Sequence, residues 1–266
     1  MVTPARSGRQ RRLGQNFLAD TNLLEAIVRD SGVGPGDVAL EFGAGGGALS
    51  ELLAERADHL HVVEIDRRLE DELAPLAARR NVSVHWGDAM KLDLAALEPA
   101  PGIVVSNLPY SVATPLILRT IEELPGVDRW TVMVQREVAE RLRATPGSRV
   151  YGVPSVLVQL AAEVELTRRV GPEVFVPRPR VDSALLRMRR TGDAAPAPVH
   201  ELVRDAFAHR RKSLARSLEL ARPGRLDDAR EALGELGLPE DARAESLSPG
   251  EFAALASKLA RMTNDE

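Results

Sequence analysis

The chain has 266 residues, of which 44% are hydrophobic and none is cysteine, and its net charge is −4. This length predicts one large domain with a smaller one, and the lack of cysteine excludes disulfides and thiolate metal sites. No apolar run approaches the roughly 18 residues of a membrane span, and the polar, basic start is not a secretory signal. We therefore expect a cytoplasmic protein that does not enter a membrane.

Short β-rich runs alternate with helical patterns over the first two thirds of the chain. Strands are expected at 38–42, 60–65, 82–85, 103–105, 130–135, 163–168 and 181–188, and helices at 20–30, 48–57, 67–78, 114–122, 136–143 and 153–161. This alternation predicts an α/β fold with a doubly wound, mostly parallel sheet that binds ligands at the carboxyl ends of its strands. The last two strands are expected to form an antiparallel hairpin at one edge.

A linker is expected at 191–198, and the patterns beyond it are purely helical, at 199–209, 213–221, 225–236 and 249–260. The sequence therefore predicts three parts. A basic N-terminal segment, 1–19, contributes to the site; an α/β domain spans 20–192; and a small all-helical domain spans 198–266.

Charge is distributed unevenly along these parts. Basic residues outnumber acidic ones in 1–19, 167–190 and 204–216, while the remainder of the chain is acidic. Any one basic segment is usually ordinary solvated surface. Three of them in an acidic chain favour a polyanionic partner, RNA or DNA.

A glycine-rich turn, Glu41–Gly47, follows the first of these strands and precedes a helix. Such turns let the backbone approach a ligand closely, and they serve nicotinamide, flavin and S-adenosyl-L-methionine alike. Glu64, at the end of the next strand, is placed to accept hydrogen bonds from ribose hydroxyls, and Asp88, after the third, from an adenine amino group. An acid beside the glycines would repel a pyrophosphate but tolerates a sulfonium cation, so the pattern favours S-adenosyl-L-methionine.

The tetrapeptide Asn107-Leu108-Pro109-Tyr110 follows the fourth strand. The Asn107 side-chain oxygen and the backbone carbonyl of Leu108 or Pro109 can each accept one N–H bond of an aromatic amino group. That pair of bonds frees the lone pair of the nitrogen for attack, while Tyr110 stacks on the ring. A strand followed by an ordinary proline turn would have a similar sequence.

Together these motifs resemble the rRNA adenine N6-dimethyltransferases of the KsgA and Erm types. The resemblance runs nearly end to end, through LGQNFL at 13–18, EID at 64–66, QREVAER at 135–141, YGVPS at 151–155, FVPRPRVDS at 175–183 and FAHRRKS at 207–213. The second half is closer to the KsgA type, which dimethylates two adjacent adenines near the 3′ end of 16S rRNA. The Erm type dimethylates one adenine of 23S rRNA and confers macrolide resistance. Ala44 and Ser111 depart from residues that are usual in the family.

The resemblance implies a Rossmann-like class I S-adenosylmethionine-dependent methyltransferase with a small helical C-terminal domain. It implies direct methyl transfer to N6, with S-adenosyl-L-homocysteine as product and no metal. The expected enzyme is a monomer that acts on 16S rRNA within an immature small ribosomal subunit, in ribosome biogenesis. The residues expected at the cofactor are Gln15, Asn16, Leu18, Glu41, Gly43, Gly45, Glu64, Ile65, Asp88, Ala89 and Asn107.

Further roles come from the same resemblance. Phe175 is expected to stack on the target adenine opposite Tyr110, although an isolated phenylalanine is more often part of a core. The expected RNA contacts are Arg11, Arg12, Arg178, Arg180, Arg210, Arg211 and Lys212, the last three of which could instead stabilise a helix end. Three alternatives stay open: an Erm-type enzyme, a DNA or protein-glutamine amino methyltransferase, and a non-catalytic small-subunit assembly factor.

Overall fold

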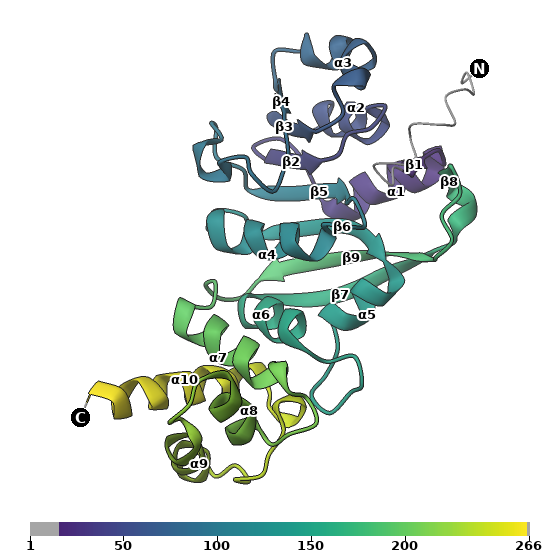
Figure 1. The fold of residues 1–266 in the computed structure, drawn as a ribbon. Helices are drawn as coiled ribbons and strands as arrows, with labels where there is room; N and C mark the ends of the chain where they lie inside the picture. Colours follow the sequence, from purple (N-terminus) through teal and green to yellow (C-terminus); the bar gives the residue numbers. More distant parts are fainter. Residues whose placement is uncertain (1–15, 265–266) are drawn as a thin grey trace. The chain divides into compact units, whose positions relative to one another are not determined.

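The computed structural model describes residues 16–264 (Figure 1). The expectations for Gln15, Arg11, Arg12 and most of the basic segment 1–19 therefore lie outside the described residues. The chain forms two compact units. The first combines the residues up to Ala139 with Val164–Arg190, and the second combines Glu140–Glu163 with the residues from Thr191 onward.

A mixed sheet forms the centre of the first unit. In the described chain it has seven strands, in the order β4 (Val82–Trp86), β3 (His59–Glu64), β2 (Val38–Phe42), β5 (Ile103–Asn107), β6 (Arg129–Gln135), β9 (Ser183–Arg190) and β7 (Ala162–Val170). The strands from β4 to β6 are parallel, and β9 is antiparallel to β6. The mostly parallel, doubly wound sheet is thus confirmed, with the last two long strands at one edge.

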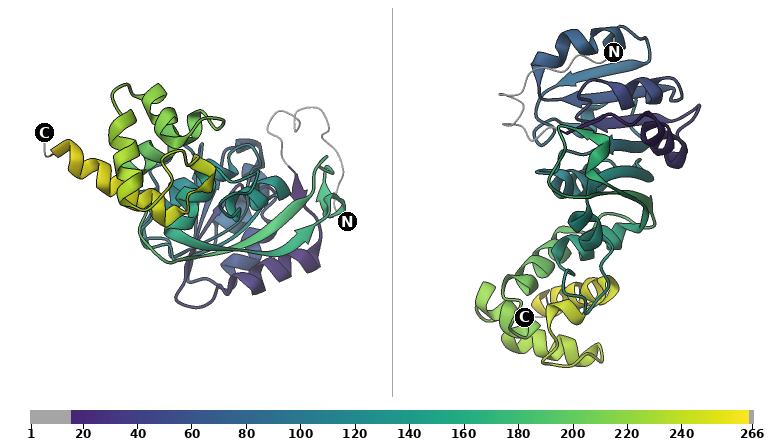
Figure 2. Two further views of the ribbon diagram at one scale, coloured as in Figure 1. Left: turned by 90° about the horizontal axis from the view of Figure 1, so that it is seen from below. Right: turned by 90° about the vertical axis from the view of Figure 1, so that its right-hand side faces the viewer.

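Helices cover both faces of this sheet (Figure 2). One core cluster joins alternate strand residues to the apolar sides of α1 (Thr21–Ser31), α2 (Ala48–Ala54) and α3 (Glu70–Ala77). On the opposite face lies α4 (Ala113–Glu123), where Trp130 Nε1 donates to Thr120 Oγ1 at 2.9 Å. Because both faces are covered, the sequences of central strands such as β2 are almost entirely apolar.

A second, small sheet lies beside the first. Its two strands, β1 (Phe17–Leu18) and β8 (Phe175–Val176), are antiparallel, with Leu18 opposite Phe175. The N–H of Ala19 extends the pairing to the carbonyl of Val174 at 2.9 Å. Two-residue strands are too short to show alternation, so no local pattern predicts this ribbon.

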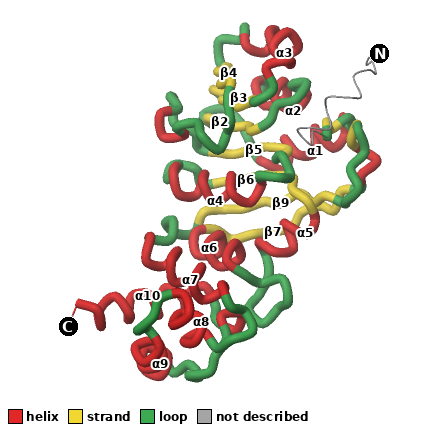
Figure 3. Tube along the Cα trace, viewed as in Figure 1, coloured by secondary structure: helices red, strands yellow, loops and turns green. Residues whose placement is uncertain are grey.

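The second unit is helical (Figure 3). Its helices are α6 (Val153–Ala161), α7 (Ala197–Ala208), α8 (Leu214–Ala221), α9 (Leu226–Glu235) and α10 (Pro249–Asn264), while α5 (Arg136–Leu142) follows β6. The helix α6 packs against α7 and α10, which is why 140–163 groups with this unit although the expected boundaries place it in 20–192. Those boundaries stay a prediction. Across the described chain, no helix combines the length and the hydropathy that a membrane crossing requires.

Candidate functional site

The predicted site residues of the first unit meet at the carboxyl ends of β2, β3, β4 and β5. Backbone hydrogen bonds connect neighbouring strand ends, from Gly43 N–H to Val63 O at 2.7 Å and from Gly87 N–H to Glu64 O at 2.9 Å. A Cβ added to Gly43 would lie 3.3 Å from Pro109 Cγ, so the glycine turn touches the Asn107–Tyr110 loop. This is the edge at which parallel sheets of this kind bind their ligands.

The strands β2 and β5 separate at this edge. Their pairing ends with Leu40 opposite Val104, after which the Ser106 side chain replaces the backbone ladder. Ser106 Oγ donates to the Phe42 carbonyl at 2.8 Å and accepts from the Phe42 N–H at 3.3 Å. The hydroxyl therefore sets the distance between the glycine turn and the loop that begins at Asn107.

The glycine turn is held in shape by Glu64 and Phe17. Glu64 is buried, and its two carboxylate oxygens accept from the N–H groups of Gly45 at 3.0 Å and Asp66 at 2.8 Å. One lone pair on each oxygen remains for a further donor. Gly45 has a φ of 56°, and a Cβ there would lie 2.6 Å from the Phe17 ring, so this position needs glycine for its backbone angle and for its space.

Glu41 lies behind the turn rather than at the ligand. The residue is only 1% exposed, and its Oε2 accepts from Ser50 Oγ on α2 at 2.5 Å. Burial raises the pKa of this carboxyl group to about 8, the Ser50 hydrogen bond lowers it and the negative charge of Glu64 raises it. The carboxyl group of Glu41 therefore joins β2 to α2 in this structure, and its contact with the cofactor stays a prediction.

The loop after β4 is anchored by an arginine that sequence reasoning missed. Asp88 accepts from the N–H of Met90 at 2.9 Å, and its side chain is 38% exposed. Arg119, on α4, donates to the carbonyls of Ala89 and Leu92 and pairs with Glu123 at 2.5 Å. Arg119 thereby fixes the loop that carries Asp88 and Ala89. Ile65, the residue after β3, is 53% exposed.

The Asn107 side chain is oriented by the N-terminal ribbon. Its Nδ2 donates to the Asn16 carbonyl at 3.2 Å, so the amide oxygen faces the other way. Oδ1 is buried and has no hydrogen-bond partner among the described residues. A buried acceptor without a partner costs free energy, and it is satisfied when a ligand donates to it.

Tyr110 and Phe175 differ in their surroundings. Tyr110 is half-buried, and its hydroxyl lies 2.5 Å from Ser183 Oγ. Phe175 is 2% exposed and belongs to the core cluster, against which Leu18 also packs. Pairing with β1 thus places Phe175 in the core of this structure, and its stacking on the target adenine stays a prediction.

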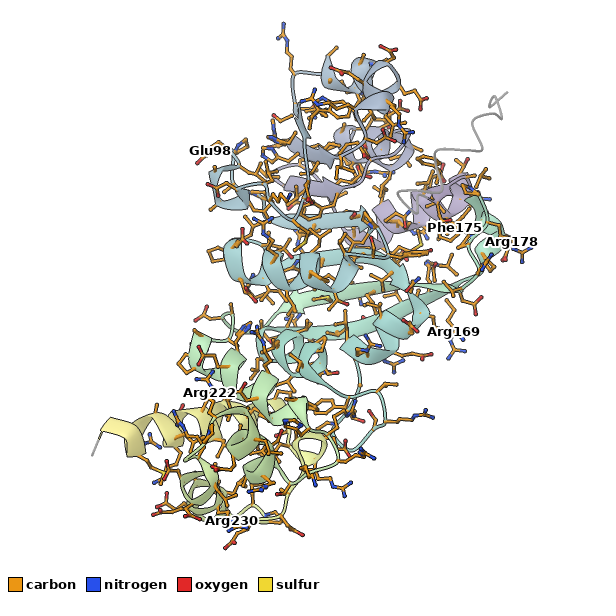
Figure 4. All side chains as sticks on the ribbon, viewed as in Figure 1. Glu98, Arg169, Phe175, Arg178, Arg222 and Arg230 are labelled. Atoms are coloured by element: carbon orange, nitrogen blue, oxygen red, sulfur yellow. The ribbon has the colours of Figure 1, made fainter. Side chains whose placement is uncertain are left out.

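The described arginines of the predicted RNA surface lie in both units. Arg178 and Arg180 are exposed on the loop after β8 and have no ion-pair partner among the described residues; Figure 4 shows Arg178 pointing outward. Arg210, in the second unit, pairs with Glu245 at 3.3 Å and lies over the Phe207 ring. Arg211 and Lys212 are exposed in the connection between α7 and α8.

A sequence model for ribosomal RNA adenine dimethylases matches residues 6–261. The chain belongs to this family. A "Ribosomal RNA small subunit methyltransferase A" from Rubrobacter xylanophilus is 46% identical to this dimethylase, over 97% of the chain and 99% of the relative. Its namesake from Streptomyces coelicolor is 44% identical, over 91% of the chain and 88% of the relative.

Solved structures share the fold of this chain. A dimethyladenosine transferase from Plasmodium falciparum superposes with a TM-score of 0.79 at 23% identity, over 94% of the dimethylase chain and 98% of its own. The 23S rRNA methyltransferase ErmE gives a TM-score of 0.67 at 26% identity, over 92% and 100%. The fold is therefore that of class I methyltransferases.

Within the family frame, the structure adds Phe17, Ser106, Arg119 and Ser183 to the predicted site residues. Phe17 and Ser183 lie within motifs that carried the resemblance, but neither residue type suggested a role. The contacts of Ser106 and Arg119 depend on which strands and helices become neighbours, and no local sequence pattern predicts those neighbours. In the described chain, histidine, aspartate and glutamate side chains form no group of three placed to hold a metal.

Proposed function

We propose that this dimethylase transfers methyl groups from S-adenosyl-L-methionine to N6 of two adjacent adenines near the 3′ end of 16S rRNA, in an immature small ribosomal subunit. Membership of the adenine dimethylase family supports the reaction. The names of relatives such as the one from Rubrobacter xylanophilus support the small-subunit target. The single observation that carries the chemistry is the buried, unpartnered Oδ1 of Asn107 beside the glycine turn.

The strand-end residues fit S-adenosyl-L-methionine, which supplies an electrophilic methyl group when bound. The turn at Gly43–Gly47 brings backbone close to a ligand, and it carries no side chain that would repel a cation. Glu64 has a lone pair on each oxygen for ribose hydroxyls, and the exposed Ile65 offers an apolar surface for a purine ring. The partly exposed Asp88 carboxylate suits an adenine amino group.

Asn107 and its neighbours would act on the acceptor base. Asn107 Oδ1 accepts one N–H of the adenine amino group, and the carbonyl of Leu108 or Pro109 accepts the other. Two accepted hydrogen bonds draw the nitrogen away from conjugation with the ring and direct its lone pair at the methyl group. The target adenine leaves its stack to reach the pocket, and Tyr110 offers a face on which it stacks. After transfer the extra proton passes to solvent.

The exposed Arg178, Arg180, Arg211 and Lys212 would contact phosphates, which position folded RNA without reading its sequence. We propose that the enzyme acts as a monomer, since one chain carries both the cofactor edge and the acceptor loop.

Two substrates test the proposal. The enzyme is given radiolabelled S-adenosyl-L-methionine with either an undermethylated small ribosomal subunit or protein-free 23S rRNA, and the modified bases are mapped. Label on two adjacent adenines of the small subunit alone is expected. Label on naked 23S rRNA would instead favour the alternative that the similarity to ErmE suggests. Label on neither would contradict the proposed activity and leave an assembly factor.

Asn107→Ala tests the role of the acceptor oxygen. Turnover is expected to fall roughly 100-fold, while the Kd of the cofactor changes much less, because the lost interaction is made with the acceptor. Asn81→Ala is the matched control: its amide donates to Ala54 O at 2.8 Å and has a structural role. Equal losses of turnover and cofactor affinity in Asn107→Ala would refute the assignment.

A further inference from the structure

The hydroxyl of Tyr110 ends on a buried serine. Ser183 is 0% exposed, and its Oγ lies 2.5 Å from the Tyr110 hydroxyl. Neither side chain has a second hydrogen-bond partner in the described part of the chain. Because water does not reach Ser183, its hydroxyl depends on Tyr110 for a hydrogen bond, and removing the Tyr110 hydroxyl leaves a buried polar group unsatisfied.

Ser183 is a fixed point in the sheet. It is the first residue of β9 and pairs with Gln135, the last residue of β6. The preceding residue, Asp182, accepts at its backbone carbonyl from the Arg136 N–H at 3.0 Å and pairs with the Arg136 guanidinium at 2.8 Å. These contacts leave the serine little freedom to shift along the strand.

The backbone of the acceptor loop is held to β6, the strand that pairs with β9. The N–H of Leu108, two residues before Tyr110, donates to the Met133 carbonyl on β6 at 3.0 Å. Tyr110 is therefore held at both ends: through the backbone near its Cα, and through its hydroxyl at the far end of the ring. A side chain fixed in this way has one ring plane, whereas a phenylalanine at this position could swing about its Cβ.

We propose that Ser183 is a positioning residue for methyl transfer, which holds the Tyr110 ring by its hydroxyl in the plane on which the acceptor base stacks. This inference rests on the proposed function of Asn107–Tyr110 as the acceptor loop. Stacking in a defined plane places the amino nitrogen in line for attack, and small errors in such placement lower the rate of the chemical step. Ser183 also ends the loop that carries Arg178 and Arg180, so the hydrogen bond connects the Tyr110 ring to the segment proposed to contact RNA.

A double-mutant cycle tests the tether. Ser183→Ala, Tyr110→Phe and the double variant are compared for kcat on the undermethylated small subunit and for the Kd of S-adenosyl-L-methionine. Each single variant is expected to lose roughly three- to tenfold in kcat, the range that the net strength of one hydrogen bond allows. The double variant should lose no more than either single variant, and the Kd should stay within about twofold in all three.

Two outcomes would overturn the proposal: single variants with the kcat of the wild type, or a double variant whose loss is the product of the single losses. Tyr151→Phe is the matched control, because it removes the hydroxyl of the other tyrosine, which donates to the Leu247 carbonyl at 2.9 Å in the second unit. It should lower stability without changing kcat. If Tyr151→Phe also lowers kcat, loss of stability alone explains the lower kcat of the other variants, and this outcome would count against the role of the Tyr110–Ser183 hydrogen bond.

Tyr110→Ala separates this inference from the proposed function. If Tyr110→Ala retains full methyl transfer, the stacking role of Tyr110 fails and the tether fails with it. If Tyr110→Ala loses activity while Ser183→Ala and Tyr110→Phe keep the turnover of the wild type, only the role of Ser183 is wrong.

Discussion

Replacing Glu41 with glutamine is expected to change how the stability of the protein depends on pH. The carboxyl group has an ordinary pKa of 4.5, and burial raises this pKa to about 8 in the folded chain. The folded state therefore binds more protons than the unfolded state between these two pH values. Its stabilising contribution is complete below about pH 4.5 and is lost as the pH rises through 8.

The size of the effect follows from the shift. At about 1.4 kcal/mol per pKa unit, a rise from 4.5 to about 8 corresponds to an upper limit of about 5 kcal/mol between the two ends of the window. Glu41→Gln keeps an acceptor oxygen for Ser50 Oγ and cannot ionise. The amide adds a cost of its own, but that cost does not depend on pH.

Urea unfolding at pH 5, 6, 7 and 8.5 measures the prediction. The free energy of unfolding of Glu41→Gln minus that of the wild type should rise with pH, by several kcal/mol over the series. Other titrating groups are common to both proteins and cancel in this difference. Glu25→Gln, on the exposed side of α1, is the control and should follow the wild type. A difference for Glu41→Gln that stays constant within about 0.5 kcal/mol would refute the reasoning.

Three further predictions concern other parts of the first unit. Arg119→Met should weaken S-adenosyl-L-methionine binding about tenfold with kcat nearly unchanged, because the Ala89 and Leu92 carbonyls lose their donor. Equilibrium binding measures this, with Arg143→Met, at an exposed position, as the control. Gly45→Ala should cost roughly 1–3 kcal/mol of stability by denaturant titration, and adding Phe17→Ala should recover the steric part but not the part due to φ. Desolvation lowers the pKa of buried His61 to about 4, so the stability that it contributes above pH 6.5 is lost as the pH falls toward 4. His61→Gln should reduce the loss of unfolding free energy at acid pH by at most about 3 kcal/mol. An unchanged acid dependence of the unfolding free energy would contradict this.

The sheet was predictable because its signals are local. The apolar runs at β2, β3 and β5, each followed by polar residues, located the strands and the edge where Glu64, Asp88 and Asn107 meet. Glu41 shows where this reasoning stops. Its position beside the glycines follows from the sequence, but the direction of its side chain depends on how α2 packs against β2, and this packing gives it Ser50 as a hydrogen-bond partner.

Phe175 and Arg119 illustrate the same limit over longer distances. The core position of Phe175 follows from pairing with Leu18, which is 157 positions away in the sequence and belongs to a two-residue strand. Arg119 lies on a helix whose pattern reports only its apolar side, so its contacts with the Ala89 and Leu92 carbonyls could not be inferred. The segment 140–163 has a helical pattern that fits either unit, and its grouping with the second unit reflects the packing of α6 against α7 and α10, which no local pattern predicts.

The pairing of β1 with β8 makes completion of the site depend on how much of the chain has been synthesised. Asn16, which orients Asn107, lies next to a strand whose partner begins only at Phe175, so about two thirds of the chain must be made before that partner exists. A nascent chain can form β2 to β6 and their helices earlier, because these contacts are closer in sequence. We expect the five parallel strands to assemble while the acceptor geometry is still missing, so part of the sheet forms before the protein becomes competent to act.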